Sequence, residues 1–299
     1  MNWYLKCYYG YKNRWDELLV IWAIQWIFHN YDIEKIYVES GDEIWMRKWL
    51  NANEKLLDKN IFDRINIIWK NWYKSLWSDL KLFLWWWELF TDQRPFPYDW
   101  WNYILKFRKE IFWWKVVMIW WIGKIRKIRT KILYDITLGK AEKIICREKI
   151  SFELAKKYNN NTELYHDFAL DVIDKCMEFI KVQESDYVII NVNSHIMNDK
   201  QNIEYILNFI IENKGKQFYF FPCDIKDDQK YFEYFEEIIP NLILHNWTRF
   251  SIQENLNFLA GCENAIWTRL HFLLVLKYLG KRFIPIVYQE KIEKMILQN

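Results

Sequence analysis

The chain has 299 residues, and its 42 basic and 39 acidic residues leave a formal net charge of +3. This length suggests two domains of ordinary size, and a charge balance this even argues against nucleic acid as a partner. The five cysteines lie far apart in the sequence and form no C-x-x-C pair. That spacing argues against a zinc site and a disulfide framework, and it favours a reduced, cytoplasmic setting.

The sequence also lacks the marks of membrane insertion. Its first residues show neither the charged nor the apolar region of a signal peptide. The most apolar segment, residues 111–122, is interrupted by Lys115 and is too short to cross a bilayer. We therefore expect no transmembrane segment.

The first half of the chain alternates between two hydrophobic periods. The period of two residues, with bounding polar turns, predicts strands at residues 3–9, 33–38, 61–68, 79–84, 115–121 and 142–146. The helical period predicts helices at residues 16–29, 42–58, 98–112, 127–138 and 149–158. Asp16 and Glu17 mark the start of the first helix, because acids in a first turn complement the helix dipole. A polar spacer at residues 159–162 precedes a short segment and a helical stretch at 171–180.

The second half repeats this alternation. Strands are predicted at residues 187–192, 217–221 and 242–245, and helices at 199–213, 228–238 and 251–260. Residues 265–288 then read as a strand end, a turn, an amphipathic helix and a second strand, and a last helix begins at residue 289. Strands alternating with helices predict parallel sheets. We expect an α/β protein with two Rossmann-like domains, residues 1–183 and 184–299, that face a cleft.

The tryptophan content is abnormal. The chain has 20 Trp and only 7 Gly, and Trp85, Trp86 and Trp87 form a triplet where a strand should meet a tight turn. Such turns favour a residue that takes positive φ without strain. Our hypothesis is that many of these Trp are glycines in the native organism, encoded by UGA, which some bacterial lineages read as glycine. A truly Trp-rich surface for membranes or carbohydrate is the alternative, and UGG codons at positions 85 to 87 would contradict the hypothesis.

Arg269 and His271 stand out in the stretch from 265 to 288. They lie where a strand end passes into a helix, and the free N–H groups of a helix start favour an anion. A fixed cation and an imidazole two residues apart therefore predict a site for an acidic substrate. A surface arginine and a structural histidine are the alternative reading. Trp267 lies just before this helix, where its indole is expected to overhang Arg269 and His271.

Five segments, taken in order, resemble the polysaccharide pyruvyl transferase family when suspect Trp are read as Gly. They are Y-Y-G-Y-K-N-R-W-D-E, F-L-W-W-W-E-L-F-T-D, V-V-M-I-W-W-I-G-K-I, I-C-R-E-K-I-S and A-I-W-T-R-L-H-F-L-L. Each is weak alone, but five in the family's order are fairly specific and cover nearly the whole chain. The resemblance implies a GT-B-like architecture, with the acceptor bound by residues 1–183 and the donor by residues 184–299.

Enzymes of this family move the enolpyruvyl unit of phosphoenolpyruvate onto two hydroxyls of a sugar. The resemblance therefore implies phosphoenolpyruvate as co-substrate, with no metal and no cofactor. It also implies a sugar or lipid-linked saccharide acceptor on the way to a cell-envelope polysaccharide or exopolysaccharide. Such an acceptor would bring the protein into peripheral contact with the inner face of the membrane.

The resemblance assigns roles to the charged residues of the motifs. His271 becomes the general acid that protonates the enol carbon, and Arg269 an anion clamp. Arg147 becomes a second clamp, and Asp167 a group that orients a cation or an acceptor hydroxyl. The structural alternatives are an ion pair of Arg147 with Glu148 or Asp167, and a helix or turn cap for Asp167.

The acceptor is expected near the first strand-to-helix turn, because α/β proteins bind ligands at such turns. The candidate acceptor-binding residues are Asn13, Asp16, Glu17, Glu88 and Asp92. A helix cap and solvated acids explain the same letters.

Two other functions remain open. A GT-B-type glycosyltransferase would use a nucleotide sugar on the same architecture, and it predicts a nucleotide-shaped pocket with an acid for the ribose diol. A non-catalytic carbohydrate- or envelope-binding protein becomes the better reading if the Trp residues are real, because indoles at the motif positions would fill the cleft.

Overall fold

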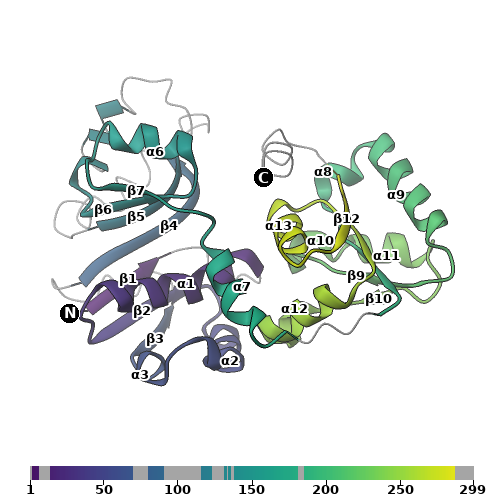
Figure 1. The fold of residues 1–299 in the computed structure, drawn as a ribbon, viewed down its shortest axis with the longest axis horizontal. Coiled ribbons are helices and arrows are strands. Elements are labelled where there is room, and N and C mark those ends of the chain that lie inside the picture. The colour runs from purple at the N-terminus through teal and green to yellow at the C-terminus, as the bar shows by residue number, and fades with distance from the viewer. Residues whose placement is uncertain are drawn as a thin grey trace. The chain divides into compact units, whose positions relative to one another are not determined.

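The computed structural model describes residues 2–6, 14–69, 80–90, 116–122, 131–132, 134–135, 138–180 and 185–286; side chains at 6, 14–16, 80–90, 116–122, 270 and 271 lie outside that description. The chain divides into two compact units, here called the N-terminal unit (Met1–Tyr11, Leu19–Leu50, Leu57–Asp171) and the C-terminal unit (Lys12–Leu18, Asn51–Leu56, Val172–Asn299). Each unit contains its own sheet, coloured purple to teal in the first and green to yellow in the second (Figure 1). The expected boundary between residues 183 and 184 stays a prediction.

The N-terminal unit contains a seven-stranded parallel sheet in the order β3-β2-β1-β4-β5-β6-β7. Its strands are β1 Asn2–Lys6, β2 Lys35–Ser40, β3 Ile65–Trp69, β4 Leu80–Phe90, β5 Val116–Ile122, β6 Lys143–Cys146 and β7 Thr162–Leu164. The helices between them are α1 Arg14–Asn30, α2 Glu43–Ala52, η1 Glu54–Leu56, α3 Lys59–Phe62, η3 Leu138–Lys140, α6 Lys149–Lys156 and α7 Ala169–Met177. The order reverses between β1 and β4, as in a doubly wound fold.

The C-terminal unit contains a five-stranded parallel sheet in the order β10-β9-β8-β11-β12. Its strands are β8 Tyr187–Ile190, β9 Gln217–Phe220, β10 Ile243–Leu244, β11 Asn264–Trp267 and β12 Arg282–Pro285. The helices are α8 Ser194–Met197, α9 Lys200–Glu212, α10 Ile225–Asp228, α11 Tyr231–Glu236, η4 Trp247–Arg249, α12 Ile252–Gly261 and α13 Leu270–Tyr278. The chain leaves the central strand β8 toward one side and returns through β11 on the other.

Apolar side chains of the central strands form the core of the C-terminal unit. Val188 and Ile190 of β8 pack with Phe218 and Phe220 of β9 and with Ile266 of β11, and all five are buried. Runs of three buried residues at the ends of β8 and β11 fit a parallel sheet that is covered on both faces. This packing fixes where β8 and β11 end, and so where the polar residues that follow them lie.

One local contact and one long-range contact fix the start of α12. Ser251 and Glu254 form a capping box at the start of α12, so the helix that leads into β11 begins at a defined residue. The Asn53 side chain accepts a hydrogen bond from the Ile252 N–H at 2.7 Å. This contact connects residue 53, in the segment 51–56 of the same unit, to α12.

Several sequence predictions were wrong in detail. Residues 61–68 are not one strand, because α3 ends at Phe62 and β3 begins only at Ile65. The short strand β7 and the one-turn helix α8 were not predicted, since each is too brief to show a period. The predicted helices at 98–112 and from 289 onward lie outside the described residues, as does most of the one at 127–138.

The tryptophan clusters do not lie in left-handed turns where the structure describes them. Trp85, Trp86 and Trp87 are within β4, which continues to Phe90 instead of ending before the triplet. Among the described residues, Asn241 is the non-glycine residue with positive φ, at 64°. Positive φ therefore gives no argument for glycine at these positions, and the codon reading stays a hypothesis.

Among the helices that the structure describes, none has both the length and the hydropathy needed to cross a membrane.

Candidate functional site

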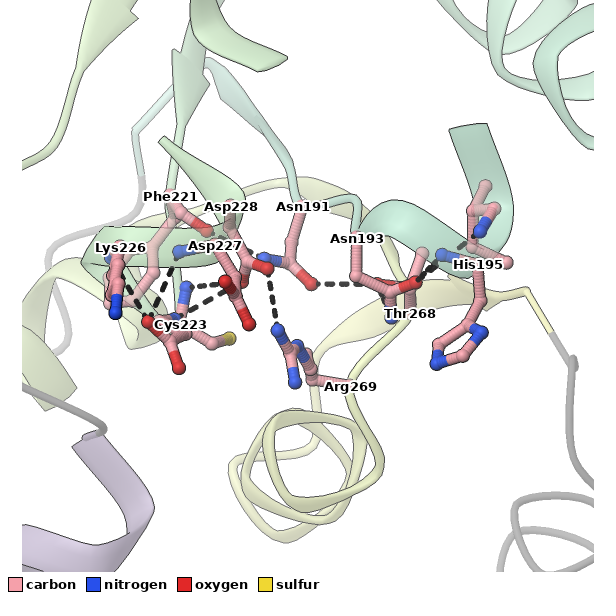
Figure 2. Close-up of polar contacts among 12 residues, drawn as sticks. Asn191, Asn193, His195, Phe221, Cys223, Lys226, Asp227, Asp228, Thr268 and Arg269 are labelled. Atoms are coloured by element: carbon pink, nitrogen blue, oxygen red, sulfur yellow. Dashed lines mark hydrogen bonds and ion pairs between the residues drawn. The ribbon is translucent and has the colours of Figure 1, made fainter. Parts of the chain in front are cut away.

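The site lies at the carboxyl edge of the C-terminal sheet, where the strand order reverses between β8 and β11. Ligands of open α/β sheets bind in the crevice at such a switch point. Asn191 and Asn193 follow β8, and Thr268 and Arg269 follow β11. All four belong to the group of polar contacts that Figure 2 shows.

A directed chain of hydrogen bonds connects the ends of β8, β9 and β11 (Figure 2). The Asn191 side-chain N–H donates to the Phe221 carbonyl at 2.8 Å, so its oxygen is the acceptor for the Thr268 hydroxyl at 3.0 Å. The Asn193 side-chain N–H donates to that same hydroxyl oxygen at 3.3 Å. Asn191, Asn193 and Thr268 are all buried. Because these hydrogen bonds connect the side chains to one another and to the Phe221 carbonyl, they hold the backbone at Thr268 and Arg269 in place.

Asn193 also starts the helix that follows β8. Its side-chain oxygen accepts the N–H groups of His195 at 3.0 Å and Ile196 at 3.3 Å. This cap fixes the backbone at His195, which is exposed on α8. The two ends of the switch point are thus connected through the side chains of Asn193 and Thr268.

Arg269 is the N-cap residue of α13, and its guanidinium pairs with a buried carboxylate. Its Nη2 donates to Asp228 Oδ1 at 2.6 Å (Figure 2). The Asp228 side chain is 0% exposed, whereas that of Arg269 is 30% exposed. The Arg269 side chain is therefore anchored at a buried carboxylate and partly exposed at the edge of the sheet.

Asp224 organises the loop after β9 beside this pair. Its Oδ1 accepts the N–H groups of Lys226 and Asp227, at 3.0 and 3.2 Å, and so caps α10. Burial raises the pKa of the Asp224 carboxyl above its ordinary value, and the negative charges of Asp227 and Asp228 raise it further. The Asp227 N–H and the Arg269 charge act in the opposite direction but do not reverse the shift.

Trp267 does not overhang the site, contrary to expectation. Its side chain is 0% exposed. The indole stacks on Phe272 with ring centroids 4.8 Å apart and lies 5.3 Å from the Phe221 ring. Trp267 is the last residue of β11 and belongs to its buried run, whereas the first partly exposed side chain after the strand is that of Arg269. No acceptor for the indole N–H is found among the described residues.

Arg147 and Asp167 are brought together in the N-terminal unit. Arg147 follows β6 and donates to Asp167 Oδ2 at 3.1 Å, with the side chains 11% and 4% exposed. Asp167 Oδ1 accepts the Ala169 N–H at 3.2 Å at the start of α7. The structural alternatives, an ion pair and a helix cap, are both formed. Roles in substrate binding stay predictions for these two residues.

The other predicted site residues are described less fully. His271 lies in the first turn of α13, but its side chain is outside the described set, as are those of Asp16 and Glu88. Asn13 and Asp92 lie outside the described residues altogether. Glu17 is 0% exposed in α1, so it is not a solvated acid. No group of three His, Cys, Asp or Glu side chains that could hold a metal ion occurs within the described ranges.

Three residues of the site, Asp224, Asp228 and Thr268, were not predicted from the sequence. Thr268 lies in the predicted turn, and Asp228 was predicted to be the first residue of a helix at 228–238. The structure instead ends α10 at Asp228 and starts α11 at Tyr231. The sequence D-I-K-D-D, residues 224–228, could have indicated this part of the site. It places three aspartates just after an aromatic strand, at the strand's carboxyl end.

No protein-family model matches the sequence, and no curated protein matches it. Solved structures do resemble it. The chain is similar to UDP-N-acetylglucosamine 2-epimerase from Rickettsia bellii, with a TM-score of 0.58 and 11% identity, over 99% of this chain and 81% of that chain. The enzyme of the same name from Methanocaldococcus jannaschii gives a TM-score of 0.54 and 11% identity, over 99% and 86%.

An α-glucosyltransferase solved with UDP and a 13-mer DNA containing an HMU base is similar at a TM-score of 0.50 and 11% identity, over 95% of this chain and 79% of that chain. At such identities the likeness shows the fold alone. The expected α/β fold with two Rossmann-like units of GT-B type is confirmed. How the units face one another stays a prediction.

Thr268→Val is expected to destabilise the protein. Valine keeps the volume but removes the hydroxyl, which leaves the Asn191 oxygen and the Asn193 N–H buried without this partner. An unsatisfied buried polar group costs roughly 1–3 kcal/mol. Urea unfolding monitored by circular dichroism measures the loss. Thr248→Val, which removes a half-buried hydroxyl bonded within its own turn, is the control and should cost less. Equal losses of stability in the two variants would contradict the structural role given to this chain of hydrogen bonds.

Asp167→Asn is expected to change the pH dependence of stability. Burial raises the pKa of Asp167 more than the Arg147 charge lowers it. A carboxyl with a raised folded-state pKa favours the folded state when protonated, and that contribution is lost as pH rises from below its ordinary value of 3.8 through the raised one. Wild type should therefore lose stability relative to Asp167→Asn over that window. Urea titrations across it test the sign, with the exposed Asp174→Asn as control; the opposite slope would mean that the ion pair outweighs burial.

Proposed function

We propose that the protein is a sugar-processing enzyme that binds an anionic donor at the carboxyl edge of its C-terminal sheet. The observation that carries this proposal is the Arg269 side chain, which pairs with a buried carboxylate at the switch point and is 30% exposed. Two further observations support it. The α13 helix begins at Leu270, directly after Arg269, so its first N–H groups add to the attraction for an anion. The fold is that of enzymes named for sugar chemistry.

A nucleotide sugar is the first candidate donor. The epimerases similar to this chain are named for a UDP sugar, and the α-glucosyltransferase was solved with UDP. Its diphosphate would accept hydrogen bonds from the guanidinium of Arg269 and from the start of α13. Charge-assisted bonds of this kind are about twice as strong as neutral ones. The reaction would be transfer to, or rearrangement of, a sugar.

Phosphoenolpyruvate is the second candidate, and a separate observation favours it. Arg269 is the N-cap of α13 and His271 lies in its first turn, so the Arg-x-His spacing places both at the edge that the resemblance to pyruvyl transferases requires. In that reaction His271 protonates the methylene carbon of the donor, and two acceptor hydroxyls add to the neighbouring carbon as phosphate leaves. One hydroxyl proton returns to His271 and the other leaves with the phosphate. A saccharide acceptor near the acidic residues of the first strand-to-helix turn remains part of this proposal.

Arg269→Gln is expected to weaken binding of the donor by at least tenfold, about 1.4 kcal/mol, because it removes a charge-assisted hydrogen bond. Isothermal titration with UDP, UDP-N-acetylglucosamine and phosphoenolpyruvate measures this and decides between the two donors. Arg249→Gln is the matched control, since Arg249 is an exposed arginine of η4 in the same unit. Wild-type affinity in Arg269→Gln, or no binding of any probe to wild type, would contradict the proposed function.

His271→Ala tests the second candidate. If phosphoenolpyruvate is the donor, this variant should lose phosphate release in the presence of saccharide acceptors, because the general acid is gone. Donor binding should stay within about tenfold of wild type, roughly 1.4 kcal/mol. Phosphate release and donor affinity are measured on the same preparation, with His29→Ala as control for a histidine of the N-terminal unit. Near-full turnover would show that His271 is not the acid.

A further inference from the structure

Asp228 is a fully buried carboxylate that holds two parts of the C-terminal unit at once (Figure 2). Its Oδ1 accepts the hydrogen bond from Arg269 Nη2 at 2.6 Å, at the end of β11. Its Oδ2 accepts the N–H groups of Cys223 at 3.0 Å and Asp224 at 3.1 Å, in the loop after β9. The carboxylate thus spans the central strand's two neighbours and ties the guanidinium to a fixed backbone.

We propose that Asp228 is the positioning residue of the donor site, which sets the direction in which the Arg269 guanidinium meets an anion. The inference rests on the proposed function, since it gives Arg269 a ligand. Arginine has several rotatable bonds, and a guanidinium held at one nitrogen loses little further freedom when its outer edge binds. The buried carboxylate supplies that hold.

Charge and position predict opposite effects at this residue. A carboxylate 2.6 Å from the guanidinium partly cancels the positive field that an anion meets. If Asp228 acted by charge alone, its neutralisation would therefore tighten anion binding. If it positions Arg269, neutralisation weakens binding, because the guanidinium is no longer fixed toward the ligand. The sign of the change separates the two roles.

Asparagine at this position cannot keep both sets of contacts. Its side chain has one oxygen and one NH2 group, whereas Asp228 uses one oxygen for Arg269 and the other for two backbone N–H groups. If the oxygen of asparagine faces Arg269, its NH2 group meets the Cys223 and Asp224 N–H groups. If the side chain is turned over, the NH2 group meets the guanidinium instead. Either orientation releases one of the two parts that Asp228 ties together.

The test compares four proteins: wild type, Asp228→Asn, Arg269→Gln and the double variant. Affinities for UDP and for phosphoenolpyruvate are measured by isothermal titration. We expect Asp228→Asn to weaken binding of the donor that wild type prefers about tenfold, or 1.4 kcal/mol. We expect the double variant to bind as Arg269→Gln does, because Asp228 acts through Arg269. Asp227→Asn makes the same charge change one residue away on an exposed side chain, and it should leave affinity unchanged or slightly higher.

Tighter or unchanged binding in Asp228→Asn overturns the proposal, and so does a further loss in the double variant. Should Asp228→Asn fail to fold, Asp228→Glu replaces it. That variant keeps the charge but moves the carboxylate by one methylene, so the same tenfold loss is expected and wild-type affinity would overturn the role.

The failure of the proposed function is distinguishable from the failure of this inference. If wild type binds neither probe, the proposed function falls. The positioning role then falls with it. If wild type binds a probe and Arg269→Gln weakens that binding, wild-type affinity in Asp228→Asn overturns this inference alone and leaves the proposed function standing.

Discussion

The ion pair between Asp228 and Arg269 is the interaction on which the candidate site depends. A buried carboxylate costs several kcal/mol to desolvate, and it is tolerated only when hydrogen bonds and a counter-charge replace the lost water. Asp228 accepts hydrogen bonds from Cys223 and Asp224 in one loop and from Arg269 in another, so its carboxylate holds the two loops together. The sheet brings these loops together because β9 and β11 flank β8.

The neighbouring chain of hydrogen bonds from Asn193 through Thr268 to Asn191 also satisfies buried polar groups, but these groups are neutral. Polar side chains at the carboxyl ends of parallel strands are buried here by the loops above them, so each must find a partner within the edge itself. The result is a rigid edge that carries the partly exposed side chain of Arg269. Such rigidity favours anion binding, because hydrogen-bond donors that are already in place lose little further freedom when the ligand binds.

The sequence predicted the order of the elements well, because long apolar periods record which faces are buried. It predicted the strand end at Cys146, and it selected Arg269 from the turn that follows β11. It failed where tertiary contacts decide the role of a residue. Asp228 looked like a helix start, and only the fold shows that its carboxylate meets an arginine 41 positions away. Trp267 looked exposed because it stands beside a turn, yet packing against Phe272 draws it inward.

The buried indole at position 267 bears on the codon hypothesis through its free energy. A buried Trp removes about 150–250 Å² from water, roughly 4–6 kcal/mol of stabilisation as an upper estimate, whereas an N–H without an acceptor costs roughly 1–3 kcal/mol. The indole is therefore stabilising as written. Glycine there would forfeit that packing but would not touch the contacts of Thr268 or Arg269, which are made by their own side chains. The contacts of the proposed anion site are therefore compatible with either reading of the codon, and the stability of the protein would differ.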